Sequence, residues 1–173
     1  MGPRSIEAGA VYSLLRYGVQ VKTEVGKVTE TVDLIDWKHP ERNDFAVAEE
    51  VTLRGGHERR PDIVLYVNGI AIGVLELKRS SVSIGHGIRQ SLSNQQAEFN
   101  ERFFSTVQFI FAGNDSEGLQ YGTVGTEEKY FLKWKEDEQD DSRFKLDKCL
   151  LKMCEKGRLI ELMHDFVLFA GRV

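Results

Sequence analysis

The sequence has few cysteines and no long apolar run. Cys149 and Cys154 are the only cysteines, and no cluster of histidines accompanies them, so the usual ligand spacing of a zinc site is absent. We expect both to be buried free thiols in a reducing cytoplasm. No apolar run approaches the roughly 20 residues that span a bilayer, and the N-terminus lacks a basic segment followed by an apolar core. These absences predict an unprocessed, cytoplasmic protein without a membrane segment.

Positive charge is also scarce. The 173 residues carry 23 Lys and Arg against 27 Asp and Glu, a formal net charge of −4, which argues against a phosphate-binding surface all around the molecule. A nucleic-acid substrate would need a local basic patch or a partner that holds it. The sequence lacks G-x-x-x-x-G-K-[ST], so the chain itself is not expected to hydrolyse ATP. Length and a 41% hydrophobic content predict one domain with a real core.

Apolar periodicity predicts alternating helices and strands. Helical spacing is found in residues 6–17, 84–103 and 144–169; a hairpin is expected over 19–36, and strands over 45–53, 106–114 and, in shorter form, 119–126 and 129–134. The acidic run 135–141 has nothing apolar to bury and predicts a solvated loop. The order predicts an α/β fold with a mixed β-sheet flanked by helices and a C-terminal helical segment.

The stretch "RPDIVLYVNGIAIGVLELK", residues 60–78, contains the charged residues of greatest interest. Two arms around Asn68 and Gly69 are apolar on both faces, as in strands that are covered on both sides of a sheet. Asp62 stands near the start, and Glu76 and Lys78 stand at the end. Two carboxylates suit a divalent Mg²⁺ or Mn²⁺ ion that accepts a substrate phosphate, and a nearby lysine can orient water or offset charge.

The length of the connecting loop decides whether these residues share a face. A two-residue turn would place Asp62 opposite Leu75 and direct Glu76 to the other side of the sheet. A three-residue loop, residues 67–69, with Gly69 in the bulge position, would place Asp62 opposite Val74 and bring Glu76 and Lys78 to its side. We therefore expect the three-residue loop. The alternative is that the three are ordinary solvated charges at strand ends.

These residues and their flanks resemble a known family. "RPDIVLYVNGIAIGVLELK" resembles the PD-(D/E)xK nuclease motif, and "NDFAVAEEVTL", "GIRQSLSNQ", "FIFAGNDSEGLQYGTV" and "LIELMHDFVLF" extend the resemblance to the N-terminal nuclease domain of the R (restriction and motor) subunit of type I restriction–modification enzymes. The resemblance implies a restriction-endonuclease-like core. It also implies that Asp62 and Glu76 bind Mg²⁺, with Mn²⁺ as a substitute, and that Lys78 is catalytic.

The resemblance further implies a type I site-specific deoxyribonuclease, a hydrolase of double-stranded DNA in a restriction system, that reads no sequence itself. Modification and specificity subunits would be partners through the full-length protein. We expect residues 1–143 to be the nuclease core and 144–173 to lead toward a motor domain outside this chain, where ATP would be used.

That family has a Gln-x-x-x-Tyr motif on the helix after the lysine, near the DNA backbone. Gln90 stands at the matching glutamine, which implies a catalytic-site role; the alternative is a polar residue on a helix surface. Four residues later stands Asn94 instead of tyrosine, so the tyrosine role does not carry over. We expect Gln95 to substitute for part of it.

Other candidate residues are less well defined by the sequence. Arg60, Arg79, Arg89 and Gln95 are expected to contact DNA, and the arginines belong to a basic cluster that includes Arg54 and Arg59. An upstream acidic ligand could be Glu7, Glu49 or Glu50, each of which also has a purely structural interpretation; Glu7, for example, suits a helix N-terminus.

Two other functions compete with the restriction nuclease. The first is a non-catalytic module of the same fold that binds DNA or docks a partner, favoured by the acidic net charge and the missing tyrosine. The second is a stand-alone repair or junction-cleaving nuclease, which the flanking resemblance disfavours.

Overall fold

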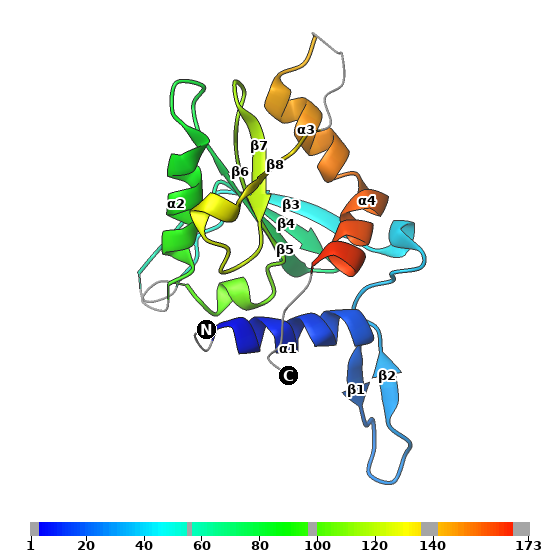
Figure 1. The fold of residues 1–173 in the computed structure, drawn as a ribbon. Helices are drawn as coiled ribbons and strands as arrows, with labels where there is room; N and C mark the ends of the chain where they lie inside the picture. Colours follow the sequence, from blue (N-terminus) through cyan, green and yellow to red (C-terminus); the bar gives the residue numbers. More distant parts are fainter. Residues whose placement is uncertain (1–3, 55–56, 97–99, 136–141, 168–173) are drawn as a thin grey trace.

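A six-stranded mixed sheet forms the centre of the protein (Figure 1). The computed structural model describes residues 4–54, 57–96, 100–135 and 142–167, with side chains from residue 9 onward. The strands, in their order across the sheet, are β3 (Phe45–Glu49), β4 (Ile63–Val67), β5 (Ile70–Leu77), β6 (Phe109–Asn114), β7 (Gly118–Gly122) and β8 (Leu132–Lys133). β5 and β6 are parallel, and the other neighbouring pairs in this sheet are antiparallel. The predicted α/β class with a mixed sheet is confirmed.

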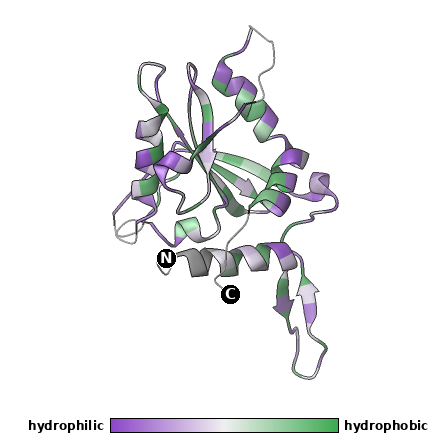
Figure 2. Cartoon of the chain, in the orientation of Figure 1, coloured by the Kyte–Doolittle hydropathy of each residue, from purple (hydrophilic) through white to green (hydrophobic). Residues whose placement is uncertain are grey.

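Helices cover both faces of this sheet (Figure 1). α2 (Ile84–Asn94) connects β5 to β6 on one side, and α3 (Lys145–Met153) and α4 (Lys156–Glu161) lie on the other. Figure 2 shows hydrophobic residues along the central strands. Strand β4 is apolar on both sides, as predicted: Leu65 and Val67 belong to the cluster shared with α3 and α4, and Val64 belongs to the cluster on the opposite face.

The N-terminal helix packs against the C-terminal π-helical turn (Leu162–Phe166). α1 (Arg4–Tyr17) confirms the predicted first helix, and the Tyr12 hydroxyl donates to the carbonyl of Met163 at 3.2 Å. Gly18 ends α1 with a φ of +77°, and a Cβ there would lie 2.7 Å from the carbonyl oxygen of Val32. Beyond it, β1 (Val19–Val21) and β2 (Glu30–Val32) form the predicted hairpin, which projects from the body of the protein (Figure 1).

The predicted helix over 84–103 is too long. α2 ends at Asn94, because the buried amide of Gln95 donates to the carbonyl of Ser91 and accepts from the backbone N–H of Gly125. Its apolar spacing had included Phe99, which lies outside the described residues, and Phe103. Phe103 instead begins a 3-10 turn (Phe103–Ser105) that buries Phe104 in the core.

Two other predicted elements are broken into shorter segments in the structure. β3 stops at Glu49 because Glu50 adopts a φ of +51°, and Leu53 then makes an isolated bridge to Arg59. The predicted helix over 144–169 becomes α3, α4 and a π-helical turn (Leu162–Phe166). Glu155 makes the break because its side chain caps α4 by accepting from two backbone N–H groups. Residues 136–141 of the predicted acidic loop, and those after 167, lie outside the described part.

The prediction of buried free thiols is confirmed for Cys149, whereas Cys154 is only half-buried. Cys149 and Cys154 are both free, and burial raises the pKa of Cys154 to about 11, which keeps its thiol protonated and unreactive. Within the described ranges, no helix combines the length and the hydropathy needed to cross a bilayer.

Candidate active site

The turn between β4 and β5 has two residues and not the three that we predicted. Val67 pairs with Ile70, and the intervening Asn68 and Gly69 have φ values of +50° and +77°. Both residues tolerate the left-handed backbone that such a tight turn requires. The three-residue prediction is therefore wrong. With this turn alone, Glu76 would be directed away from Asp62.

A β-bulge in β5 reverses that outcome. Tyr66 pairs with Ala71 but Leu65 pairs with Gly73, so Ile72 has no partner on β4. Ile72 and Gly73 face the same side: Ile72 belongs to the cluster that contains Phe111, and a Cβ on Gly73 would lie 3.2 Å from the side chains of Leu65 and Phe111. One extra residue on a strand moves every later side chain to the opposite face. The isolated glycine inside a strand was the signal available in the sequence.

The shifted register brings Asp62 and Glu76 together. Ile63 pairs with Leu75, so the next positions, Asp62 and Glu76, face one another. Oδ2 of Asp62 accepts a hydrogen bond from the backbone N–H of Leu77 at 2.7 Å, and the Asp62 carboxylate is close enough to contribute to the raised pKa of Glu76. The juxtaposition expected from the sequence is present, although a bulge produces it and not the loop.

Three further side chains surround the Glu76 carboxylate. Lys78 Nζ lies 3.9 Å from Oε2 of Glu76 and donates to Oε1 of Gln90 at 2.9 Å. Gln90 Nε2 donates to Oε2 of Glu76 at 2.7 Å, and Asn94 Nδ2 donates to Oε1 at 3.3 Å. Gln90 thus lies in the cluster, as the resemblance implied. The contact made by Asn94 was missed, although its position four residues after Gln90 places both on one face of the helix.

A glycine allows α2 to approach this cluster. Gly87 is buried against the sheet, and a Cβ at this position would lie 3.2 Å from Cβ of Ala112 and 3.5 Å from Cβ of Glu76. A larger side chain would push the helix outward. The short helix-to-strand distance at Gly87 is what lets the amides of α2 reach the Glu76 carboxylate.

Burial sets the electrostatics of the site. Glu76 is fully buried, and this burial, together with the neighbouring Asp62 carboxylate, raises its pKa to about 8, against the opposing effect of Lys78. Two adjacent carboxylates with one ammonium leave excess negative charge when both are ionised. A divalent cation would neutralise that excess, so the donor set fits a hard metal ion.

The two carboxylates are the ligands that the described residues offer. No group of three or more His, Cys, Asp or Glu side chains suited to a metal ion occurs among them. Mg²⁺ is compatible with such a site because it keeps several waters and is bound through one or two carboxylates and a substrate phosphate.

The two candidate upstream acids whose side chains are described, Glu49 and Glu50, do not join the pair. Glu7 lies before the residues whose side chains are described. Glu49 pairs with Ile63, so it is out of register with Asp62. The backbone N–H of Glu50 donates to the carbonyl of Asp62 at 2.8 Å, but the Glu50 carboxylate accepts from Arg60 at 3.3 Å.

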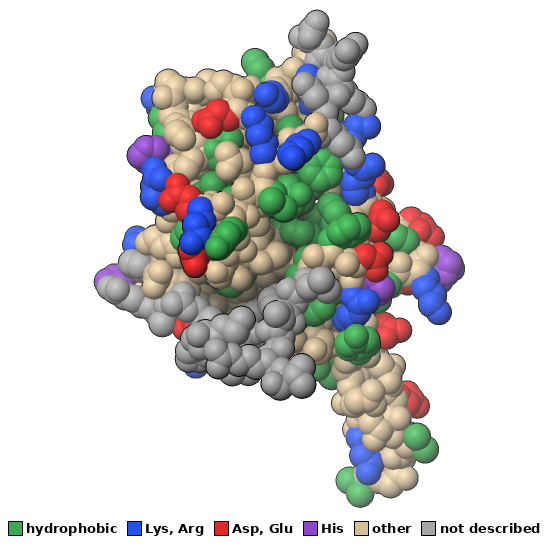
Figure 3. Space-filling model, viewed as in Figure 1, with side chains coloured by type: hydrophobic (Ala, Val, Ile, Leu, Met, Phe, Trp, Pro, Cys, Tyr) green, Lys and Arg blue, Asp and Glu red, His purple; other side chains and the backbone are tan. Residues whose placement is uncertain are grey.

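The four residues that we expect to contact DNA lie in different surroundings. Arg60 is bound to Glu50, and Arg89 is bound to Glu128 at 2.6 Å, while Arg79 is exposed. Gln95 is buried and reaches the backbone of Gly125. Figure 3 shows acidic and basic side chains interspersed on the face in view, in keeping with the net charge of −4. Contact of these four residues with DNA stays a prediction.

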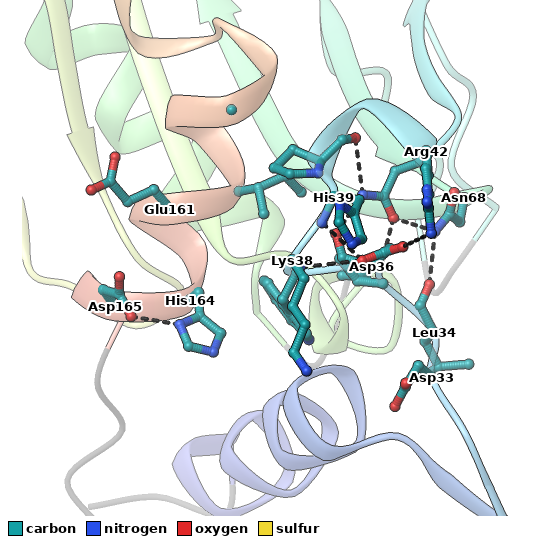
Figure 4. A pocket seen from close by; sticks show the side chains of 16 residues that line it. Asp33, Leu34, Asp36, Lys38, His39, Arg42, Asn68, Glu161, His164 and Asp165 are labelled. Atoms are coloured by element: carbon teal, nitrogen blue, oxygen red, sulfur yellow. Dashed lines mark hydrogen bonds and ion pairs between the residues drawn. The ribbon is translucent and has the colours of Figure 1, made fainter.

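A cavity of about 940 Å³ lies at the other end of the β4–β5 hairpin (Figure 4). Asn68, in the turn, contributes to its wall, together with the segment 33–43 and residues of α4 and the π-helical turn. The side chains around it carry both signs of charge; they include Asp36, Lys38, Arg42, Glu161 and Asp165. None of the predicted site residues lines this cavity, so it is separate from the carboxylate cluster.

Replacing Glu76 with glutamine is expected to stabilise the metal-free chain at mildly alkaline pH. Burial raises the pKa of this carboxyl from 4.5 to about 8. While the carboxyl is protonated, its titration does not lower the free energy of unfolding; as pH rises from 4.5 to about 8, ionisation is favoured in the unfolded chain and the fold becomes progressively less stable. At pH 8.5 in EDTA, Glu76→Gln should melt several degrees higher than wild type, corresponding to about 2–4 kcal/mol. Near pH 4.5 this pH-dependent gain should vanish, which leaves only the constant effect of the acceptor oxygen that glutamine lacks.

Thermal melts across this pH range measure the effect. Glu24→Gln, which changes a highly exposed carboxylate in the β1–β2 hairpin, is the matched control and should show no such trend. A constant difference between Glu76→Gln and wild type at every pH would contradict the assigned burial of an ionisable Glu76.

The architecture and the carboxylate pair define a class before any relative is considered. A mixed sheet flanked by helices, with Asp62, Glu76 and Lys78 beside the helix that follows, is compatible with a restriction-endonuclease-like fold. The family model described as "Type I restriction enzyme R protein N terminus" matches residues 6–129, well over half of the chain. The chain belongs to this family.

Curated relatives agree with this membership. The chain is 30% identical over 176 residues to the "Type I restriction enzyme HindI endonuclease subunit" of Haemophilus influenzae, covering 91% of this chain and 16% of that protein. It is 29% identical over 157 residues to the "Putative type I restriction enzyme MjaVIIIP endonuclease subunit" of Methanocaldococcus jannaschii, covering 86% and 14%. The chain thus spans less than a fifth of these relatives' length. These matches support a role in a type I restriction system.

Proposed function

We propose that this chain is a Mg²⁺-dependent DNA endonuclease domain of a type I restriction enzyme R subunit, which cleaves phosphodiester bonds of foreign DNA without reading their sequence. The observation that carries the proposal is the strand register that sets Asp62 opposite Glu76, with Lys78 Nζ 3.9 Å from Glu76. Family membership supports the restriction role.

Each residue of the cluster would have a distinct task. Asp62 and Glu76 would hold the ion, which when bound supplies an activated water and neutralises charge on the phosphate. The Lys78 ammonium would orient the water or offset phosphate charge. Gln90 bonds to both Glu76 and Lys78, so it would fix their relative placement.

The remaining partners belong to the proposal as well, because the chain is a small part of its relatives' length. Double-stranded DNA would be the substrate. Modification and specificity subunits would associate through the full-length protein, and ATP would be used only in its motor region. The division into a nuclease core, 1–143, and a segment leading to the motor, 144–173, is part of the same proposal.

DNA nicking tests the proposal directly. Supercoiled plasmid is incubated with the chain in EDTA and then with excess Mg²⁺ or Mn²⁺. We expect nicked and linear products only when the divalent ion is in excess. Absence of any ion-dependent product, or equal cleavage in EDTA, would contradict metal-dependent hydrolysis.

A non-catalytic module is the second candidate. The specific observation in its favour is that Asn94 occupies the place of the family's tyrosine, while no third carboxylate joins Asp62 and Glu76 within the described residues. This candidate predicts that the chain retards duplex DNA in a gel and leaves it uncut with either ion.

A further inference from the structure

Asn94 makes a contact that neither the motif nor the comparisons assign to it. It is 1% exposed and lies on the face of α2 that packs against the sheet. Its Nδ2 donates to Oε1 of Glu76 at 3.3 Å, and Gln90 donates to Oε2 at 2.7 Å. Two amides one helical turn apart therefore hold the two oxygens of one carboxylate.

This arrangement leaves acceptor lone pairs of Glu76 available for a cation. An ionised carboxylate offers about four lone-pair directions, so each oxygen of Glu76 can accept one amide hydrogen bond and still bind a metal ion. Rotation of the carboxylate about its last side-chain bond would disturb both amide contacts. The two donors together restrict Glu76 to one orientation, and Gln90 alone would fix only one oxygen.

Burial of the Asn94 amide also carries a free-energy cost that packing does not explain. Oδ1 of Asn94 is buried and has no hydrogen-bond partner among the described residues. An unpaired buried acceptor typically costs about 1–3 kcal/mol, and an apolar side chain of similar size would avoid it. A polar group kept in the core at such a cost is typical of a functional site.

We propose that Asn94 is a positioning residue of the metal site, which orients Glu76 through Oε1. This inference rests on the proposed function, because it assumes that Asp62 and Glu76 bind a divalent ion. Residues that hold a metal ligand from behind typically change metal affinity by about 10–100-fold when replaced.

Calorimetric titration with Mn²⁺ tests this role without requiring catalysis. Asn94→Leu keeps the approximate side-chain volume and removes the donor; we expect its Mn²⁺ affinity to fall about 10–100-fold. The Mn²⁺ concentration for half-maximal plasmid nicking should rise by a similar factor, and the rate at saturating Mn²⁺ should stay near that of wild type. Asn94→Ala, which adds no bulk, repeats the measurement if the leucine variant does not fold.

Ser91→Ala is the matched control. Ser91 is also fully buried on α2, and its Oγ has no hydrogen-bond partner among the described residues, so it makes no hydrogen bond to Glu76. Its variant should bind Mn²⁺ like wild type. Equal affinity in the Asn94 variants and Ser91→Ala overturns the positioning role alone. A wild-type chain that binds no Mn²⁺ overturns both this role and the proposed function, and a rate that saturating Mn²⁺ cannot restore replaces positioning with a direct catalytic contact.

Discussion

Replacing Asp62 with asparagine should abolish ion-dependent DNA cleavage, with a loss of about three orders of magnitude or more. A catalytic metal contributes several kcal/mol to transition-state stabilisation, and each 1.36 kcal/mol corresponds to a tenfold change in rate. Asparagine is nearly the same size and can still accept from the Leu77 N–H, so the local backbone should be retained. Plasmid nicking measures the rate, and calorimetry should show that Mn²⁺ affinity is lost as well.

Asp44→Asn is a suitable control for this loss. Asp44 is an exposed carboxylate near the turn of the same hairpin, where its backbone N–H donates to Asn68. Its variant changes the net charge equally but should retain cleavage and Mn²⁺ binding. If Asp62→Asn cleaves as fast as this control, the carboxylate pair is not the catalytic centre.

Replacing Lys78 with alanine should separate chemistry from metal binding. The ammonium contributes positive charge next to Glu76 and is not a metal ligand, so Mn²⁺ affinity should remain close to wild type. The cleavage rate at saturating metal should fall about 100-fold or more, as expected for the loss of a positioned charge-stabilising or proton-transfer group.

Mn²⁺ affinity and cleavage rate are measured on the same protein preparations. Lys27→Ala, in the exposed β1–β2 hairpin, is the control for removal of one lysine charge. A Lys78→Ala chain that loses Mn²⁺ affinity as completely as Asp62→Asn would make Lys78 a structural partner of the carboxylates. Retained cleavage in Lys78→Ala would exclude a catalytic role for the ammonium.

Much of the fold could be predicted because local patterns determine it. The 3.6-residue spacing before Gly18 identified α1, and the apolar stretch 106–114 identified β6. The ends of helices were less predictable where the hydrogen bonds of a single side chain override the apolar periodicity. Glu155 caps a new helix through its side chain, and Gln95 closes α2 through a partner 30 residues away.

Sequence reasoning reached the carboxylate pair by an incorrect route. It treated the turn as the only place where register could change, and the structure places the change at Ile72 instead. The carbonyl of Ile72 accepts from the backbone N–H of Gln108, next to β6, at 2.9 Å. A bulge stabilised by a neighbouring strand depends on long-range pairing that the hairpin sequence does not contain, although Gly73 was a local hint.

By itself, the sequence determined the order of helices and strands, the resemblance to the R-subunit family and the inventory of Asp62, Glu76 and Lys78. These depend on residue type and spacing along the chain. Only the tertiary structure decided that Asp62 and Glu76 meet, that Asn94 and Gln90 hold Glu76, and that Arg60 and Arg89 are bound to glutamates. The physical reason is that hydrogen-bond partners and burial are chosen between segments far apart in the chain, once the β5 bulge and the close approach of α2 at Gly87 fix which side chains face one another.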